Sequence, residues 1–122
     1  MKKETYFIIV RAPDGAITTE RRTGYHYGPG GYTRLTVRPA SRGGKYDIFA
    51  ERRADGWCAT DAATGYCIVY GLKTLDSLLD EIEHGATAER VGASGGWNAI
   101  RARFPDAVKM IADARAAEIA NA

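Results

Sequence analysis

The sequence predicts an α+β fold in which an antiparallel sheet of five or six strands packs against about three helices. The N-terminal two-thirds carries short β-branched and aromatic runs separated by turn residues, as is typical of antiparallel strands. The C-terminal part carries Leu and Ile residues at helical spacing. With 122 residues, 45% of them hydrophobic, the chain has the size of one ordinary domain. We therefore expect a single α+β domain over residues 1–122.

The first strands are predicted from runs of β-forming residues and from the turns between them. Residues 5–11 form such a run, residues 13–15 read Pro-Asp-Gly, and residues 16–22 are expected to return as the second strand of a hairpin. Residues 24–31 are too rich in Gly and Pro for a helix and are expected to form a loop. Residues 32–37 alternate in polarity, so a second, looser hairpin is expected.

The remaining strands are predicted over residues 46–53, 57–61 and 66–70. An Asp-Gly step separates the first two and is among the strongest local signals for a hairpin. If residues 62–65 form the next turn, one sheet face holds an aromatic layer able to cover a helix, made of Trp57, Ala59, Ile68 and Tyr70.

The helices are predicted from apolar spacing and capping residues. Thr74 is a natural N-cap, and Gly85 ends the helix that follows. Its apolar stripe falls at i, i+3, i+4 and i+7, on Leu75, Leu78, Leu79 and Ile82. After a Gly-rich loop over residues 92–96, a short helix is expected to carry Trp97, Ile100 and Phe104 on one side. Pro105 then begins a final helix, whose inward residues are predicted to be Val108, Ile111, Ala112 and Ile119.

The two cysteines, Cys58 and Cys67, are expected to be buried free thiols. With residues 62–65 as the turn, Thr60 faces Cys67 and Cys58 faces Val69. The two thiols then share a sheet face but lie diagonally, about 7 Å apart, whereas a disulfide needs Cβ atoms about 4 Å apart. Two Cys and two scattered His do not supply the four ligands of a structural zinc site. No metal site and no cofactor are predicted.

Catalytic residues are not predicted either. His26 falls in the expected loop, and His84 lies four residues after Asp80, where a surface ion pair explains the spacing more simply than an acid–base couple. The Gly-rich loop before Trp97 lacks the Lys and the spacing of a phosphate-binding loop, and Ser94 is better explained as a helix cap. The sequence therefore supports a binding protein over an enzyme.

Charge is divided unevenly along the chain. Residues 1–53 hold 11 Lys/Arg against 5 Asp/Glu, a net charge of +6, whereas residues 54–122 hold 6 against 10, a net charge of −4. The negative charge of the second half is largely that of a solvated helix face. The basic half is the better candidate for a surface that meets an acidic partner.

The candidate partner-binding residues are the basic and aromatic side chains that interleave in this basic half. Arg side chains bind phosphate or carboxylate, and Tyr rings stack on bases or anchor protein interfaces. An ordinary wet sheet face coated in Arg and Tyr would show the same pattern. The predicted residues are Arg22, Tyr25, Tyr27, Tyr32, Arg34, Arg38, Arg42 and Lys45.

A cytoplasmic location is expected. The longest uninterrupted apolar run, residues 6–10, is far shorter than the roughly 20 residues of a membrane helix. The start of the chain also lacks the small-residue cleavage site of a signal peptide.

Residues 57–82 resemble a pattern met in short uncharacterised proteins of prophages and other mobile elements. The resemblance is carried by Trp57, Thr60-Asp61, Thr64-Gly65, Ile68, Gly71 and Thr74, which read as a Trp strand, a Thr-Gly turn, a second strand and a capped helix. Such proteins often bind and block a host defence component, as anti-CRISPR proteins do. The resemblance implies that class and assigns no functional residue.

The function expected from the sequence is a non-enzymatic phage or mobile-element inhibitor or modulator of a host protein, such as a CRISPR–Cas nuclease. It would act by protein contact through the basic Gly/Tyr/Arg face. The first alternative is a small nucleic-acid-binding accessory protein that uses the same face, and a weaker alternative is a small enzyme. The oligomeric state is left open.

Overall fold

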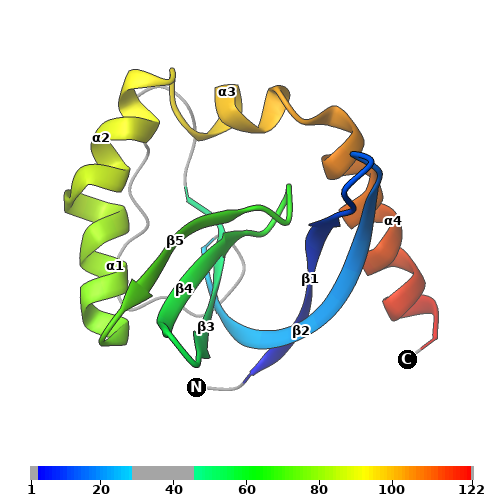
Figure 1. The fold of residues 1–122 in the computed structure, drawn as a ribbon, viewed down its shortest axis with the longest axis horizontal. Coiled ribbons are helices and arrows are strands. Elements are labelled where there is room, and N and C mark those ends of the chain that lie inside the picture. Colours follow the sequence, from blue (N-terminus) through cyan, green and yellow to red (C-terminus); the bar gives the residue numbers. More distant parts are fainter. Residues whose placement is uncertain (1–2, 29–45, 122) are drawn as a thin grey trace.

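The computed structural model describes residues 3–28 and 46–121 and shows the predicted α+β arrangement (Figure 1). The described strands are β1 (Glu4–Arg11), β2 (Ile17–Tyr27), β3 (Ile48–Arg53), β4 (Gly56–Asp61) and β5 (Cys67–Leu72). They form one antiparallel sheet in the order β1-β2-β3-β4-β5. The helices are α1 (Leu75–His84), α2 (Ala86–Ala93), α3 (Trp97–Ala102) and α4 (Pro105–Ala120). The strand expected over residues 32–37 lies outside the described residues.

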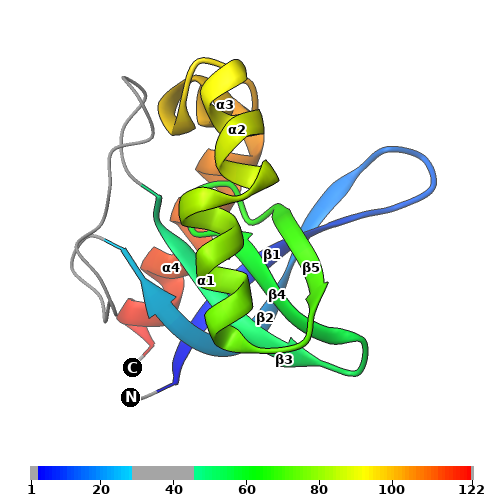
Figure 2. The ribbon, with the colours of Figure 1, turned by 90° about the vertical axis from the view of Figure 1, so that its left-hand side faces the viewer.

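The helices surround the curved sheet in chain order. In Figure 1, α1 and α2 lie on one side of it, α3 spans the top, and α4 lies beside β1 and β2 on the opposite side. The turned view shows the tip of the β1–β2 hairpin projecting away from the other strands (Figure 2). No helix among residues 3–28 and 46–121 is long and apolar enough to cross a membrane.

The curvature of the sheet arises in β2, which changes its pairing partner. Its first part pairs with β1 as far as Gly24, and Tyr25 to Tyr27 pair with β3. Gly24 allows this switch, because a Cβ there would lie 2.7 Å from the Ala50 carbonyl oxygen. Residues 24–27 were expected in a loop, and that expectation is wrong: Gly24 pairs with β1 and residues 25–27 pair with β3, so the segment is extended.

The curl brings the first strand near the last turn of the sheet. The Ile9 N–H donates a hydrogen bond to the Gly65 carbonyl oxygen at 3.0 Å, between β1 and the β4–β5 turn. Within the curve lies a small apolar cluster of Tyr6, Phe49 and Ala62. The rings of Tyr6 and Phe49 are stacked, with centroids 4.6 Å apart.

The main core lies between the sheet and the helices. Strand alternation sends Tyr27, Ile48, Ala50 and Ala59 toward α1, α2 and α3, where they meet Leu78, Leu79, Ile82, Val91 and Trp97. The predicted apolar stripe of α1 is therefore confirmed. Its predicted ends are confirmed too, since the Thr74 hydroxyl accepts a hydrogen bond from the Ser77 N–H at 3.0 Å and Gly85 is the C-cap.

Some residues expected in the core are exposed. The register shifts on both sides of Ala59, so the alternation expected along β5 breaks and Tyr70 is 69% exposed. On α4, Ile111 is buried, but Ala112 is exposed and Ile119 is 77% exposed. Ile119 lies in the last turn of α4, where the neighbouring Glu118 forms an ion pair with Arg21 of β2.

The cysteines are both free, as predicted, but only Cys58 is buried and Cys67 is exposed. Thr60 pairs with Cys67 as expected, whereas Val69 pairs with Ala59 instead of Cys58. The irregular register between β4 and β5 accounts for both differences, because it moves the chain after Cys67 out of the regular ladder.

Candidate functional site

Three residues of the predicted basic face lie in the described part of the chain, and they do not share a surface. Arg22, Tyr25 and Tyr27 all belong to β2. Tyr27 is 1% exposed and lies in the main core, so the expectation that it lies in an exposed loop is wrong. The other predicted residues, Tyr32, Arg34, Arg38, Arg42 and Lys45, lie outside the described residues.

The alternation of β2 separates Arg22 from the two tyrosines. Tyr25 packs against the main core, with its ring centroid 6.2 Å from that of Trp57. Arg22 lies on the opposite face and donates hydrogen bonds to both carboxylate oxygens of Glu51, at 3.2 and 2.5 Å. The bond to Glu51 raises the pKa of Arg22 above its ordinary value. Arg22 therefore forms an ion pair with Glu51 on the inner side of the curved sheet.

The two histidines lie in different elements, and each contacts a carboxylate. His26 is in β2, where it stacks on Phe49 and contacts the Asp47 carboxylate. His84 ends α1, with its Nε2 atom 3.8 Å from Oε2 of Glu83. No group of three or more His, Cys, Asp or Glu able to hold a metal ion is found among residues 3–28 and 46–121.

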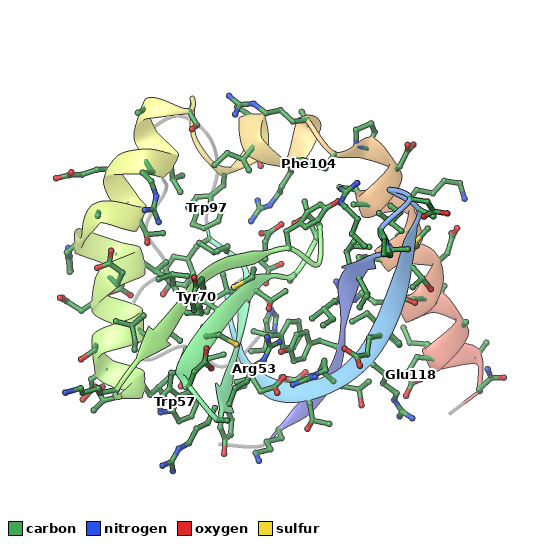
Figure 3. The ribbon with its side chains drawn as sticks, viewed as in Figure 1. Arg53, Trp57, Tyr70, Trp97, Phe104 and Glu118 are labelled. Atoms are coloured by element: carbon green, nitrogen blue, oxygen red, sulfur yellow. The ribbon has the colours of Figure 1, made fainter. Side chains whose placement is uncertain are left out.

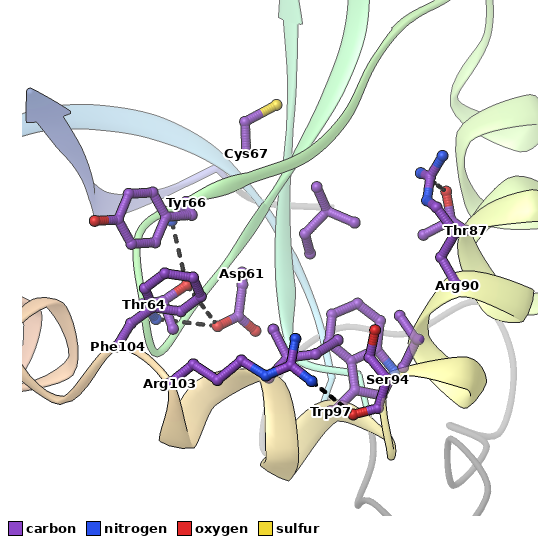
Figure 4. Close-up of a pocket in the computed structure, with 13 residues that line it drawn as sticks. Asp61, Thr64, Tyr66, Cys67, Thr87, Arg90, Ser94, Trp97, Arg103 and Phe104 are labelled. Carbon is purple, nitrogen blue, oxygen red and sulfur yellow. Dashed lines mark hydrogen bonds between the residues drawn. The ribbon is translucent and has the colours of Figure 1, made fainter.

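A candidate site is the groove between β5 and helices α2 and α3, with a volume of about 370 Å³ (Figure 4). Aromatic and aliphatic side chains form its walls, chiefly Tyr66, Ile68, Val91, Trp97 and Phe104. Trp97 is 3% exposed and closes the floor, whereas Phe104 is 38% exposed. Figure 3 shows Trp97 and Phe104 pointing from the α3 side toward the sheet.

Two exposed arginines, Arg90 of α2 and Arg103 after α3, line this groove together with the apolar side chains. Arg103 donates a hydrogen bond to the Ser94 carbonyl oxygen at 3.3 Å, and Arg90 donates one to the Thr87 hydroxyl at 3.3 Å. Each bond uses one of the five N–H donors of a guanidinium. We call this site the arginine-rimmed groove.

The acidic group in the groove is neutralised from within the chain. One Asp61 oxygen accepts hydrogen bonds from Arg101 at 3.0 and 3.2 Å, and the other accepts bonds from the Thr64 N–H and hydroxyl at 3.0 and 2.9 Å. Asp61 is only 4% exposed. Arg90 and Arg103 therefore make the mouth of the groove positive, although residues 54–122 are acidic overall.

A smaller cavity of about 230 Å³ continues from the groove toward the β1–β2 hairpin, and the two share Tyr66, Arg103 and Phe104. The Tyr66 and Phe104 rings lie 5.0 Å apart between them. Arg11 lines the smaller cavity and donates a hydrogen bond to the Tyr66 hydroxyl at 2.9 Å. Arg11 and Arg103 thus line the smaller cavity together with Asp106.

Capping and glycine residues place the helical wall of the groove. The Glu81 carboxylate of α1 accepts a hydrogen bond from the Thr87 N–H at 3.1 Å, which caps the start of α2. Gly95 and Gly96 have φ of +93° and +96°, and this left-handed turn directs Trp97 into the core. Ser94 is the C-cap of α2, so its expected role as a cap for the following helix is wrong.

Sequence reasoning missed this groove because α2 was not predicted. Residues 86–93 carry good helix formers, but the cap that completes the helix comes from Glu81, in the preceding helix. The detectable signal was the pair Arg90 and Arg103, which break the acidic pattern of the second half on either side of Trp97.

Comparisons of the chain with protein-family models, with curated protein sequences and with solved structures give no match.

Proposed function

We propose that this protein is a non-enzymatic binding protein whose arginine-rimmed groove captures an acidic segment of a partner protein. The observation that carries the proposal is the apolar groove of about 370 Å³ lined also by Arg90 and Arg103. An apolar side chain of the partner would fill the groove above Trp97, and neighbouring carboxylates would meet the guanidinium groups.

The shape of the groove favours a peptide over a nucleic acid. Base stacking needs open aromatic faces, whereas Trp97 is 3% exposed and Tyr66 lies against Phe104. The resemblance implies that the partner is a host defence protein that this protein inhibits, and this stays a prediction.

The test is a selection of displayed random peptides against the protein, followed by titration of the best synthetic peptide. We expect the selected sequences to place one large apolar residue beside Asp or Glu. A twin peptide with Asn and Gln in place of Asp and Glu should bind at least about tenfold more weakly, since each charged hydrogen bond contributes about 1.5–3 kcal/mol and 1.4 kcal/mol corresponds to a factor of ten. Trp97 fluorescence in a Trp57→Phe background reports occupancy of the groove.

Matched arginine variants locate the binding. Arg103→Gln and Arg90→Gln should each weaken the acidic peptide about tenfold. Arg115→Gln removes the same charge from an exposed position of α4 and should leave binding unchanged. Selected peptides without acidic residues, or affinity that survives both groove variants, would overturn the proposal. Tighter binding of a mixed-sequence oligonucleotide, with steep salt dependence, would favour the nucleic-acid alternative.

A further inference from the structure

Among the described strands, β5 forms an edge of the sheet, and its composition does not protect it from pairing. It reads Cys-Ile-Val-Tyr-Gly-Leu, without charge or proline, and Cys67 and Tyr70 are exposed. Natural edge strands are commonly protected by Lys, Pro, bulges or a covering segment, because their unpaired backbone groups recruit other strands. Of these features β5 has an irregular register on its inner side, toward β4, and has no Lys or Pro. The opposite edge is treated differently, since the Ile9 N–H of β1 is bonded to Gly65 and α4 packs beside this strand.

The first part of β5 also forms one wall of the arginine-rimmed groove. Cys67 and Ile68 line it from the strand, whereas Thr87 and Arg90 line it from α2. A chain lying along this edge would be within reach of the apolar floor and of Arg90. In strand addition, backbone hydrogen bonds supply affinity and every second side chain enters a pocket, which supplies specificity.

We propose that the acidic partner segment binds in extended form, as a sixth strand paired with the outer edge of β5. This inference rests on the binding function proposed above and specifies its mode. One apolar side chain of the added strand enters the groove beside Ile68 and Trp97. Asp or Glu residues flanking it meet Arg90 and Arg103.

Charge favours this occupant over a second copy of the same chain. The β5 strand of another copy carries no acidic residue, and Lys73 follows it directly. Pairing of two such edges would bring a further positive charge toward the arginines instead of the carboxylates that complement them.

The experiment uses the selected acidic peptide with single backbone N-methyl groups placed along its length. An added strand donates every second backbone N–H to its neighbour, so we expect methylation at alternate positions to weaken binding about tenfold and methylation between them to have little effect. This design leaves the protein unaltered. A peptide bound by its side chains alone, or as a helix, shows no such period of two.

Two measurements on the protein accompany the peptide series. Binding should slow amide hydrogen exchange in β5 and leave the β1 edge unchanged. It should also slow alkylation of the exposed Cys67, whereas buried Cys58 stays unreactive with or without peptide.

The outcomes separate this inference from the proposed function. If the peptide binds with the expected arginine dependence but without the alternating methylation effect, the strand inference is wrong and the binding function stands. Unchanged hydrogen exchange in β5 at saturating peptide has the same meaning. If no acidic peptide binds, the proposed function fails, and the strand inference fails with it. Self-association of the free protein that protects β5 would instead identify a second copy as the occupant.

Discussion

Glu51 occupies the centre of a polar cluster inside the curved sheet. It accepts a hydrogen bond from the Tyr6 hydroxyl at 2.6 Å and two from Arg22, and the Arg53 Nε atom lies 3.6 Å from its carboxylate. Figure 3 shows Arg53 within the curve of the sheet. Burial by itself would raise the pKa of Glu51, but the bonds from Arg22 and Tyr6 and the positive charges outweigh it and lower that pKa.

Acid should therefore destabilise the fold partly through Glu51. Because the pKa of the folded state is lowered, the stabilising contribution is complete above about pH 5, the range above the pKa of an unfolded Glu, and is lost as the pH falls through the folded pKa. Glu51→Gln should lower the free energy of unfolding at pH 7 by about 1–3 kcal/mol and flatten its dependence on pH below 5. Urea unfolding from pH 3 to pH 7 measures both effects.

Tyr6→Phe is the matched control for this prediction. It retains the ring stacked on Phe49 and removes one of the bonds to Glu51. Its stability at pH 7 and its acid slope should lie between those of the wild-type protein and Glu51→Gln. An acid slope in Glu51→Gln as steep as in the wild type would show that other carboxylates govern acid unfolding.

At the scale of elements, α1 owes its place to a local cap as well as to its apolar face. The Thr74 hydroxyl accepts the bond from Ser77, and Leu78, Leu79 and Ile82 are buried beneath the helix. The following helix, α2, starts at Gly85 with no side-chain cap of its own and depends on Glu81. Glu81 of α1 thus also caps α2.

Thr74→Ala should lower the free energy of unfolding by about 0.5–2 kcal/mol, the usual effect of losing an N-cap. Thr74→Ser keeps the accepting oxygen and should restore most of the loss. Thermal and urea unfolding measure both variants. Equal losses in the Ala and Ser variants would show that the Thr74 methyl group, and not the cap, stabilises the start of α1.

At the scale of the whole molecule, one sheet connects two groups of helices. The main core joins β2, β3 and β4 to α1, α2 and α3, while α4 packs on β1 and β2. Because β2 takes part on both sides, we expect the chain to unfold as a single cooperative domain, in agreement with the domain predicted for residues 1–122.

Leu79→Ala and Ile111→Ala test this expectation from opposite ends of the molecule. Both side chains are 1% exposed, so each substitution should cost about 2–5 kcal/mol. In each variant, Trp97 fluorescence and far-ultraviolet circular dichroism should report the same unfolding midpoint. A lower midpoint by only one probe in Ile111→Ala would show that α4 and the first hairpin unfold separately.

Local signals in the sequence determined the elements that depend on a few neighbouring residues. The predicted hairpin of β3 and β4 is present, but its turn lies at Ala54-Asp55, one residue before the predicted Asp55-Gly56 step, since Gly56 already pairs with Arg53. Thr74 and Gly85 bound α1, and Pro105 begins α4, as predicted. Turn and cap chemistry act within about one turn of chain, so these signals can be recognised without knowing the rest of the fold.

Tertiary structure alone decided how these elements meet, and with it the candidate site. The burial of Tyr27 follows from the pairing of β2 with β3, the exposure of Tyr70 follows from a register shift, and the groove joins Ile68, Arg90 and Phe104 from separate elements. Each outcome depends on which distant segments compete for the same sheet face. A local pattern of polarity cannot encode that competition, because the free energy of burial is set by the neighbours a side chain meets after folding.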